Sequence, residues 1–168
     1  MFVRNAGLVL LNPYLPVLFE RLGVLTRDEA GTPRIDGLEA ASRAVHLLQY
    51  LVDGRLDRAE PELVLNKLLC GQTTAQPVLR AIEPVQADLD ICDDLLRAVI
   101  ANWPVLRNTS PDGLRETFLQ REGRLRHRDG NWTLQVQRKT LDVLTDQIPW
   151  SFAVVYHHWM SGPIHVTW

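Results

Sequence analysis

The sequence predicts an α+β fold in which a helical part, residues 1–123, is followed by a small, mostly antiparallel β-sheet. Apolar residues recur every three or four positions over most of the helical part, which is the spacing of about five to six amphipathic helices. Residues 124–137 instead alternate apolar and polar side chains around an Asp-Gly pair, the pattern of a β-hairpin. A chain of 168 residues suits one domain. We therefore expect residues 1–168 to form a single compact domain, with the hairpin, a short helix and two terminal strands in residues 124–168.

The composition is that of an ordinary globular protein, with 46% hydrophobic and 23% charged residues. A formal net charge of −2 gives no general attraction to nucleic acid or to an anionic membrane. No apolar run approaches the roughly 20 residues of a membrane-spanning helix, so no membrane span is expected. Cys70 and Cys92 do not make a disulfide scaffold, and we expect synthesis in a reducing compartment.

The first helix is expected over residues 12–22, because Asn12 is a good N-cap residue and Pro13 suits the first helical position. Gly23 should end this helix. Residues 6–11 are expected to be a buried lead-in to it, and the polar residues 26–36 to form a loop.

Two stronger helices and a shorter one follow. The first should cover residues 37–52, with Asp36 as its cap and Gly54 after its end. A shorter helix should begin at Pro61 and close at Gly71. The longest is expected over residues 85–103, with acidic side chains in its N-terminal half, where they suit the helix dipole.

The last helix of the helical part should begin at Pro111, with Thr109 or Ser110 as its cap, and stop at Gly123. The side chains expected to face the core are Leu114, Phe118 and Leu119.

The hairpin has a predictable register, because Asp129-Gly130 is a strong two-residue turn. The expected pairs are Arg128 with Asn131, His127 with Trp132, Arg126 with Thr133 and Leu125 with Leu134. One face then carries Leu125, His127, Trp132, Leu134 and Val136, and the other carries Arg124, Arg126, Arg128, Thr133 and Gln135. A shift of one residue would mix the two faces, so pattern and turn agree.

The rest of the chain predicts a short helix that ends before Pro149 and contains Leu141, Leu144 and Ile148. Residues 152–156 and 164–168 are expected to be two strands joined by a turn at residues 161–163.

No catalytic, cofactor-binding or metal site is predicted. His157 and His158 are adjacent in a predicted strand, so their rings point to opposite faces. His46 and Cys70 lack the spacing of a zinc site.

Other candidate catalytic residues have simpler explanations. The helical carboxylate pairs Asp90–Asp94 and Asp142–Asp146 could share a proton if desolvated, but their polar neighbours favour a solvated helix face. Ser42 and Ser110 are not part of a nucleophile elbow, and the role of Ser110 as a helix cap is sufficient to account for it.

Charge is distributed unevenly along the chain. Residues 121–139 hold six basic and two acidic side chains, whereas residues 83–94 hold five acidic and no basic ones. A basic hairpin face could contact phosphate, but it lacks the interleaved aromatic side chains of a single-strand binder. Pairing with the chain's own acidic stretch, or docking on an acidic protein, is the favoured interpretation.

Tryptophan is concentrated near the end of the chain, at positions 150, 159 and 168. Trp103 and Trp132 are expected in the core. Large aromatic side chains fill the core of a small sheet or anchor protein contacts, and both readings stay open for Trp168. The residues predicted to contact a partner are Arg124, Arg126, Arg128, Trp159 and Trp168.

Several stretches in order carry a resemblance to a known family: NAGLVLLNPYLPVLFERLGVL at 5–25, AVHLLQYLVDG at 44–54, ELVLNKLLCG at 62–71, NTSPDGLRETFLQREGRL at 108–125 and WTLQVQRKTLDVLTDQIPW at 132–150. The sequence resembles the C-terminal region of tape measure proteins of (extracellular) contractile injection systems, the phage-tail-like particles of bacteria. The resemblance covers nearly the whole chain, and the block at 108–125 is its most distinctive part.

The resemblance implies a non-enzymatic structural protein without a cofactor that takes part in length-controlled assembly. Its expected partners are inner tube, spike or baseplate components, and nucleic acid is not among them. Its expected place is the bacterial cytoplasm during assembly and afterwards the released particle.

A ruler needs a long extended portion, and no helix here is expected to exceed about 20 residues at ~1.5 Å each. The chain is then either the terminal domain of a longer ruler or a short family member with an anchoring or chaperone-like task. We therefore predict a docking or anchoring domain. The alternatives are a small hydrolase that uses the Asp pairs or His46, and a weak nucleic-acid-binding module that uses the basic hairpin.

Overall fold

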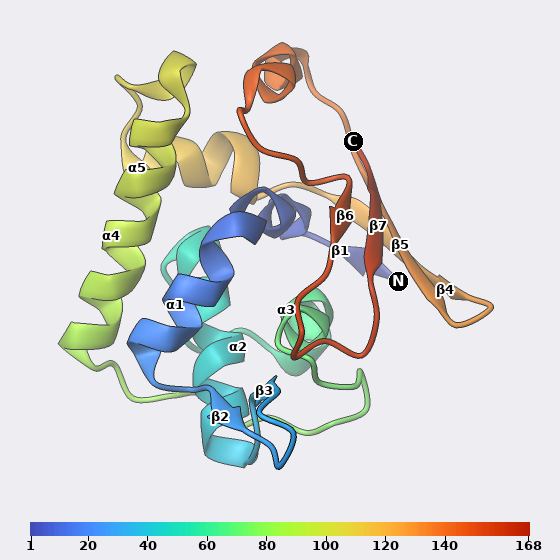
Figure 1. Cartoon of the computed structure of the whole chain (residues 1–168). Coiled ribbons are helices and arrows are strands. Elements are labelled where there is room, and N and C mark those ends of the chain that lie inside the picture. Colours follow the sequence, from blue (N-terminus) through green and yellow to red (C-terminus); the bar gives the residue numbers. More distant parts are fainter.

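The computed structural model describes all residues 1–168 and confirms the α+β fold. In Figure 1 the helices occupy one side of the molecule, with α4 (Gln86–Asn102) at its outer edge. A five-stranded sheet runs along the other side, and its strands β4 (Gly123–Arg128) and β5 (Asn131–Val136) extend beyond the body as a hairpin.

The first helical segment begins earlier than predicted. The expected lead-in is a 3-10 helix, η1 (Ala6–Tyr14), which continues directly into α1 (Leu15–Leu22). The prediction of Asn12 as an N-cap is wrong, because Asn12 and Pro13 lie inside η1. A proline inside an α-helix removes a backbone hydrogen bond, whereas the short 3-10 segment accommodates Pro13 and brings Pro16 into the first turn of α1.

The two strongest helices lie where the sequence placed them. α2 (Leu38–Asp53) ends at Gly54 as predicted, and α4 starts and ends within one residue of its expected bounds. Asp36 does not cap α2; the cap residue is Gly37, which has a φ of 91° and makes no side-chain cap hydrogen bond.

The predicted third helix consists of a 3-10 turn, η2 (Glu60–Leu63), followed by α3 (Val64–Leu69). The segment that follows α3 is held against α2 by two interactions of the Leu79 backbone. Ser42 Oγ accepts a hydrogen bond from the backbone N–H of Leu79 at 2.8 Å, and His46 Nε2 lies 2.7 Å from the carbonyl oxygen of Leu79.

The cap before α5 (Pro111–Leu114) is Ser110 rather than Thr109. Its Oγ accepts a hydrogen bond from the backbone N–H of Gly113 at 3.0 Å, which satisfies one of the free donors at the helix start.

α5 then widens into a π-helical turn, η4 (Arg115–Leu119). The prediction that Gly123 ends this helix is wrong, because the helix ends at Leu119 and Gly123 is the first residue of β4. A Cβ on Gly123 would lie 2.8 Å from the Cβ of Ala6, so the glycine serves close packing between β4 and η1.

The hairpin register is confirmed pair by pair. Asp129 and Gly130 both have positive φ, 51° and 79°, as a two-residue hairpin turn requires. Leu125, Leu134 and Val136 are buried on one face, and the arginines of the other face are exposed.

The sheet has the strand order β1-β4-β5-β7-β6. The sequence did not indicate β1 (Phe2–Val3), which pairs antiparallel with β4. β6 (Val154–Val155) and β7 (Ile164–Thr167) form the expected terminal pair but are shorter than predicted. β5 and β7 pair in parallel, whereas the other pairings are antiparallel.

Two smaller elements complete the fold. The short helix after the hairpin is the 3-10 helix η5 (Thr140–Gln147). Within the predicted loop at residues 26–36, β2 (Thr26–Arg27) and β3 (Pro33–Arg34) form a separate two-stranded ladder.

One contiguous core joins the helices to the sheet. Trp103 is fully buried, lies 4.8 Å from the ring of Phe118 and donates a hydrogen bond from Nε1 to the carbonyl oxygen of Leu144 at 3.1 Å. It therefore ties α4, η4 and η5 together. None of the helices has both the length and the apolar composition of a membrane span.

Candidate functional site

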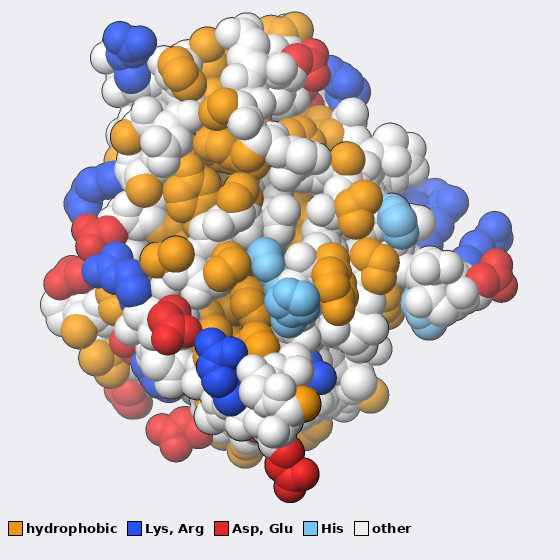
Figure 2. Space-filling model, viewed as in Figure 1, with side chains coloured by type: hydrophobic (Ala, Val, Ile, Leu, Met, Phe, Trp, Pro, Cys, Tyr) orange, Lys and Arg blue, Asp and Glu red, His pale blue; other side chains and the backbone are white.

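A group of exposed basic side chains lies on the hairpin of residues 123–136, which we call the hairpin arm. Arg124, Arg126 and Arg128 alternate along β4 and point to the exposed face. None of the ion pairs of the structure includes them. Figure 2 shows Lys or Arg side chains, in blue, on the part of the molecule that projects at the right, where Figure 1 places the hairpin. The Arg124 guanidinium lies over the ring of Phe2, 5.0 Å from its centroid, so the arm presents three exposed guanidinium groups that have no carboxylate partner.

The opposite face of the arm changes character along its length. Near the body Leu125 and Leu134 are buried. Near the turn the imidazole of His127 stacks on the Trp132 indole at 4.6 Å between ring centroids. Trp132 was expected in the core, but it is only half-buried, because this end of the arm lies beyond the helices that cover the sheet.

A buried ion pair fixes the base of the arm. Arg121 Nη1 donates to Asp142 Oδ2 at 2.7 Å and to the carbonyl oxygen of Gln137 at 3.0 Å. Arg121 Nη2 donates to the carbonyl oxygen of Thr117 at 2.7 Å. Since Arg121 precedes β4 and Gln137 follows β5, this guanidinium joins the two ends of the arm to η5.

The expectation that Asp142 belongs to a solvated helix face is wrong. Its side chain is 1% exposed, whereas that of Asp146 is 71% exposed. Burial by itself raises the pKa of Asp142, but hydrogen bonds from Arg121, the Lys139 backbone N–H and Trp168 outweigh it and hold the pKa below its ordinary value of 3.8. Asp142 is therefore a buried carboxylate with a structural role.

Acid should weaken the fold through Asp142. A carboxyl with a lowered pKa in the folded protein stabilises it fully above the ordinary pKa of 3.8, and this contribution is lost as the pH falls through the lower folded pKa. We expect the free energy of unfolding to decrease more steeply between about pH 5 and pH 2 in the wild type than in Asp142→Asn. Urea unfolding across this range measures both slopes, and equal slopes would contradict the prediction.

The two tryptophans predicted to contact a partner lie in different surroundings. Trp159 is 6% exposed, donates from Nε1 to the Leu69 carbonyl oxygen at 2.8 Å and packs on Phe19. Its indole is part of the core and is not accessible in this fold. Trp168 is half-buried: Nε1 donates to Asp142 Oδ2 at 2.8 Å, and its ring lies 5.2 Å from the Arg121 guanidinium carbon.

The acidic stretch does not pair with the arm. Asp88 pairs with Arg43 of α2 at 2.9 Å, and Asp94 pairs with Arg21 of α1 at 3.3 Å. Of the two interpretations that the sequence favoured for the basic face, pairing with the chain's own acidic stretch is therefore not observed.

The carboxylate pair Asp90–Asp94 is exposed, as expected, and Asp90 accepts a hydrogen bond from Gln86 at 2.8 Å. No group of three or more His, Cys, Asp or Glu side chains is arranged to hold a metal ion. Burial raises the pKa of the Cys70 thiol and raises that of Cys92 to about 12, so neither thiol is a reactive nucleophile.

The histidines do not form a cluster with one another either. His46 is fully buried under the chain at Leu79. His157 and His158 lie in the turn after β6 rather than in a strand. The imidazole of His157 stacks on Trp159 at 4.5 Å, and burial lowers its pKa.

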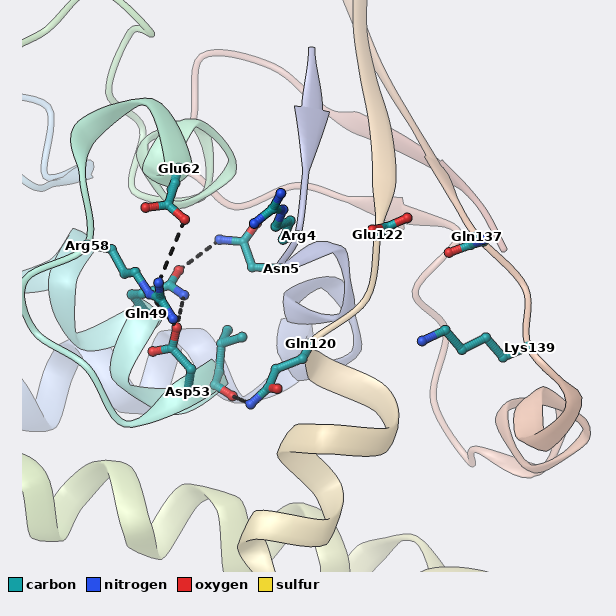
Figure 3. A pocket seen from close by; sticks show the side chains of 11 residues that line it. Arg4, Asn5, Gln49, Asp53, Arg58, Glu62, Gln120, Glu122, Gln137 and Lys139 are labelled. Atoms are coloured by element: carbon teal, nitrogen blue, oxygen red, sulfur yellow. Dashed lines mark hydrogen bonds and ion pairs between the residues drawn. The ribbon is translucent and has the colours of Figure 1, made fainter.

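A hollow of about 410 Å³ lies between α2 and the base of the arm (Figure 3), and we call it the polar hollow. Only one of its lining residues, Val52, is hydrophobic. The others are Arg4, Asn5, Gln49, Asp53, Arg58, Glu62, Gln120, Glu122, Gln137 and Lys139. Sequence reasoning missed it, because these residues come from segments far apart in the chain.

Comparison with known families matches the whole chain, residues 1–168, to the contractile injection system tape measure proteins. The chain belongs to this family. The resemblance predicted from the sequence is thus confirmed. The comparisons with curated proteins and with solved structures gave no match.

Membership in the tape measure family makes this protein a structural component of a contractile injection system, with proteins as its partners. Its longest helix, α4, has 17 residues and is about 25 Å long at ~1.5 Å per residue. No helix in residues 1–168 is therefore long enough to serve as the extended ruler itself.

Proposed function

We propose that this tape measure family member is a docking or anchoring domain without catalytic activity, which ties length-controlled assembly to the inner tube, spike or baseplate. The observation that carries the proposal is the hairpin arm: three exposed arginines without a carboxylate partner on one face of a projecting hairpin, whose base is fixed by a buried ion pair.

The arm has the chemistry of a docking element for an acidic protein surface. Guanidinium groups bind carboxylates through paired hydrogen bonds, and complementary charges speed encounter and fix orientation. The arm is also ordered before binding, because its ladder pairs Gly123 through Arg128 with Asn131 through Val136. Little conformational entropy is then lost when a partner binds.

The proposal places the protein in the bacterial cytoplasm while the particle assembles, and in the released particle afterwards. It also assigns partner contact to Arg124, Arg126 and Arg128, and to the half-exposed edge of Trp168, which directly follows β7.

Reversing the charge of the arm should weaken partner binding roughly tenfold or more, since several ion pairs of ~0.2–1 kcal/mol each are replaced by repulsion. The variant is Arg124→Glu, Arg126→Glu and Arg128→Glu combined. Its affinity for purified tube, spike and baseplate proteins is measured by surface plasmon resonance and by co-elution.

The matched control is Arg80→Glu, Arg97→Glu and Arg107→Glu combined, which changes the net charge equally at exposed positions away from the arm. We expect the control to keep its affinity. If wild-type protein binds none of the three components, the docking function is refuted. If both triple variants bind like the wild type, the arm is not the docking element.

A further inference from the structure

A second hollow lies where the N-terminal ends of α2 and α4 meet the segment that leads into α4, and we call it the apolar groove. Its volume is about 620 Å³, within the range of ligand sites. Five of its nine lining residues are hydrophobic, in contrast to one in the polar hollow. In Figure 1 the segment that leads into α4 passes α2 at the lower left, whereas the hairpin arm projects at the right.

The large aliphatic side chains of this groove are open to solvent. The exposed fractions of Leu38, Leu79 and Val85 are 51%, 42% and 50%. The three side chains come from different elements, because Leu38 begins α2, Leu79 lies in the segment after α3, and Val85 directly precedes α4. Exposed aliphatic side chains that converge on one concavity, unlike singly scattered ones, indicate a binding surface.

The groove keeps its shape without a ligand. Ser42 and His46 of α2 hold the backbone N–H and the carbonyl oxygen of Leu79, and the Ile82 N–H donates to the carbonyl oxygen of Leu56 at 3.4 Å. The segment that carries Leu79 is therefore fixed on α2. A site that is formed before binding loses little conformational entropy when its ligand arrives.

The charged groups of the groove are acidic on balance. Glu39, Glu83 and Asp88 are its acidic lining residues, and Arg43 is its one basic lining residue. Arg43 is neutralised by Asp88 at 2.9 Å, whereas Glu39 and Glu83 are exposed and belong to none of the ion pairs of the structure. Arg80 lies in the same segment but does not line the groove. Two carboxylates without a cationic partner are thus left beside the aliphatic side chains.

This combination selects the chemistry of the occupant. A purely apolar segment would desolvate the two carboxylates without supplying a cation, and the carboxylates would repel the phosphates of nucleic acid or of an anionic membrane. A protein segment that carries both large aliphatic side chains and Lys or Arg satisfies both kinds of group. It removes the exposed aliphatic surface from water and places positive charge opposite negative charge.

We propose that the apolar groove binds an amphipathic basic segment of a partner protein. Its aliphatic side chains lie on Leu38, Leu79 and Val85, and its Lys or Arg side chains lie at Glu39 and Glu83. The groove is a contact separate from the hairpin arm and of the opposite charge. One chain can then join an acidic partner surface to a basic partner segment; this bridging rests on the proposed docking function, whereas the groove contact does not.

The test titrates the full chain into a short, monomeric, fluorophore-labelled peptide that carries Leu on one side and Lys on the other, and follows the fluorescence anisotropy. One matched peptide has Ser in place of every Lys, and a second has Ser in place of every Leu. We expect the Leu/Lys peptide to bind, and each matched peptide to bind roughly tenfold or more weakly, since each lacks one of the two kinds of contact.

Two groove variants locate the binding site on the chain. Glu39→Lys combined with Glu83→Lys reverses its charge, and Leu38→Ser combined with Leu79→Ser removes its aliphatic surface. Each should weaken the Leu/Lys peptide roughly tenfold or more.

Each groove variant has a matched control at exposed positions in other elements. Glu116→Lys combined with Glu122→Lys makes the same change of net charge, and Val105→Ser combined with Val143→Ser removes two other exposed aliphatic side chains. Both controls should bind the Leu/Lys peptide like the wild type.

The proposal is overturned if the Leu/Lys peptide does not bind the wild type, if either groove variant binds it as tightly as its control does, or if either matched peptide binds as tightly as the Leu/Lys peptide. The hairpin arm is unchanged in both groove variants. Failure of the groove proposal therefore leaves the docking function of the arm standing.

Discussion

Replacing Arg121 with alanine should lower the free energy of unfolding by about 3–5 kcal/mol. Arg121 is fully buried and pairs with Asp142 at 2.7 Å. Removing it leaves the carboxylate of Asp142 buried without its cation, and leaves the carbonyl oxygens of Thr117 and Gln137 without their donor. A buried charge that has lost its partner is far more costly than an exposed one.

Urea unfolding followed by tryptophan fluorescence measures this loss. The matched control is Arg126→Ala on the exposed face of the arm, which should change stability by about 0.5 kcal/mol or less. Replacing both partners, Arg121→Met with Asp142→Leu, should cost less than Arg121→Ala, because no unpaired charge stays in the core. If Arg121→Ala is as mild as the control, the ion pair does not hold the arm.

Gly7→Ala should be destabilising by about 3 kcal/mol or more, at the upper end of the range for overpacked cores. Gly7 lies in η1 where the backbone of η4 packs directly on it. A Cβ at this position would lie 2.5 Å from the Cα of Leu119 and 2.7 Å from the carbonyl carbon of Phe118. Both neighbours are backbone atoms, which cannot rotate away as a flexible side chain can.

Gly162→Ala is the matched control, because nothing lies within 4 Å of a Cβ at that position and its φ is not positive. We expect it to be neutral or slightly stabilising, since alanine restricts the unfolded chain. Thermal unfolding and the soluble yield of the two variants give the comparison. Equal stability would show that η1 and η4 separate easily.

Both positions also bear on the proposed docking function. Arg121 fixes the ends of the arm, and Gly7 brings η1 against the turn that leads into it. We therefore expect Arg121→Ala, when assayed under conditions in which it is still folded, to bind partner proteins more weakly although it keeps all three exposed arginines.

The elements that the sequence predicted well are those governed by neighbours in the chain. The hairpin follows from Asp129-Gly130 and the alternation around it, so every pair of its register was correct. α2 and α4 follow from long apolar stripes, and Ser110 from the cap pattern before Pro111. In each case the interactions that decide the structure lie within a few residues.

The wrong predictions have the opposite origin. Asn12 has the local pattern of a cap but lies inside η1, and Gly123 has the pattern of a helix stop but begins β4. Asp142 has polar neighbours in the sequence, yet the fold buries it under Arg121 and Trp168. Contacts between distant segments outweighed the local preference at each of these positions.

By itself, then, the sequence determined the fold class, the hairpin with its basic face, and the tape measure family. The tertiary structure alone decided that the arginines of the basic face have no carboxylate partner, that Trp159 is in the core, and that the amides of Asn5, Gln49 and Asn66 meet in one buried network. The physical reason is that local patterns encode backbone geometry, whereas burial and the pairing of charges depend on which distant segments pack together.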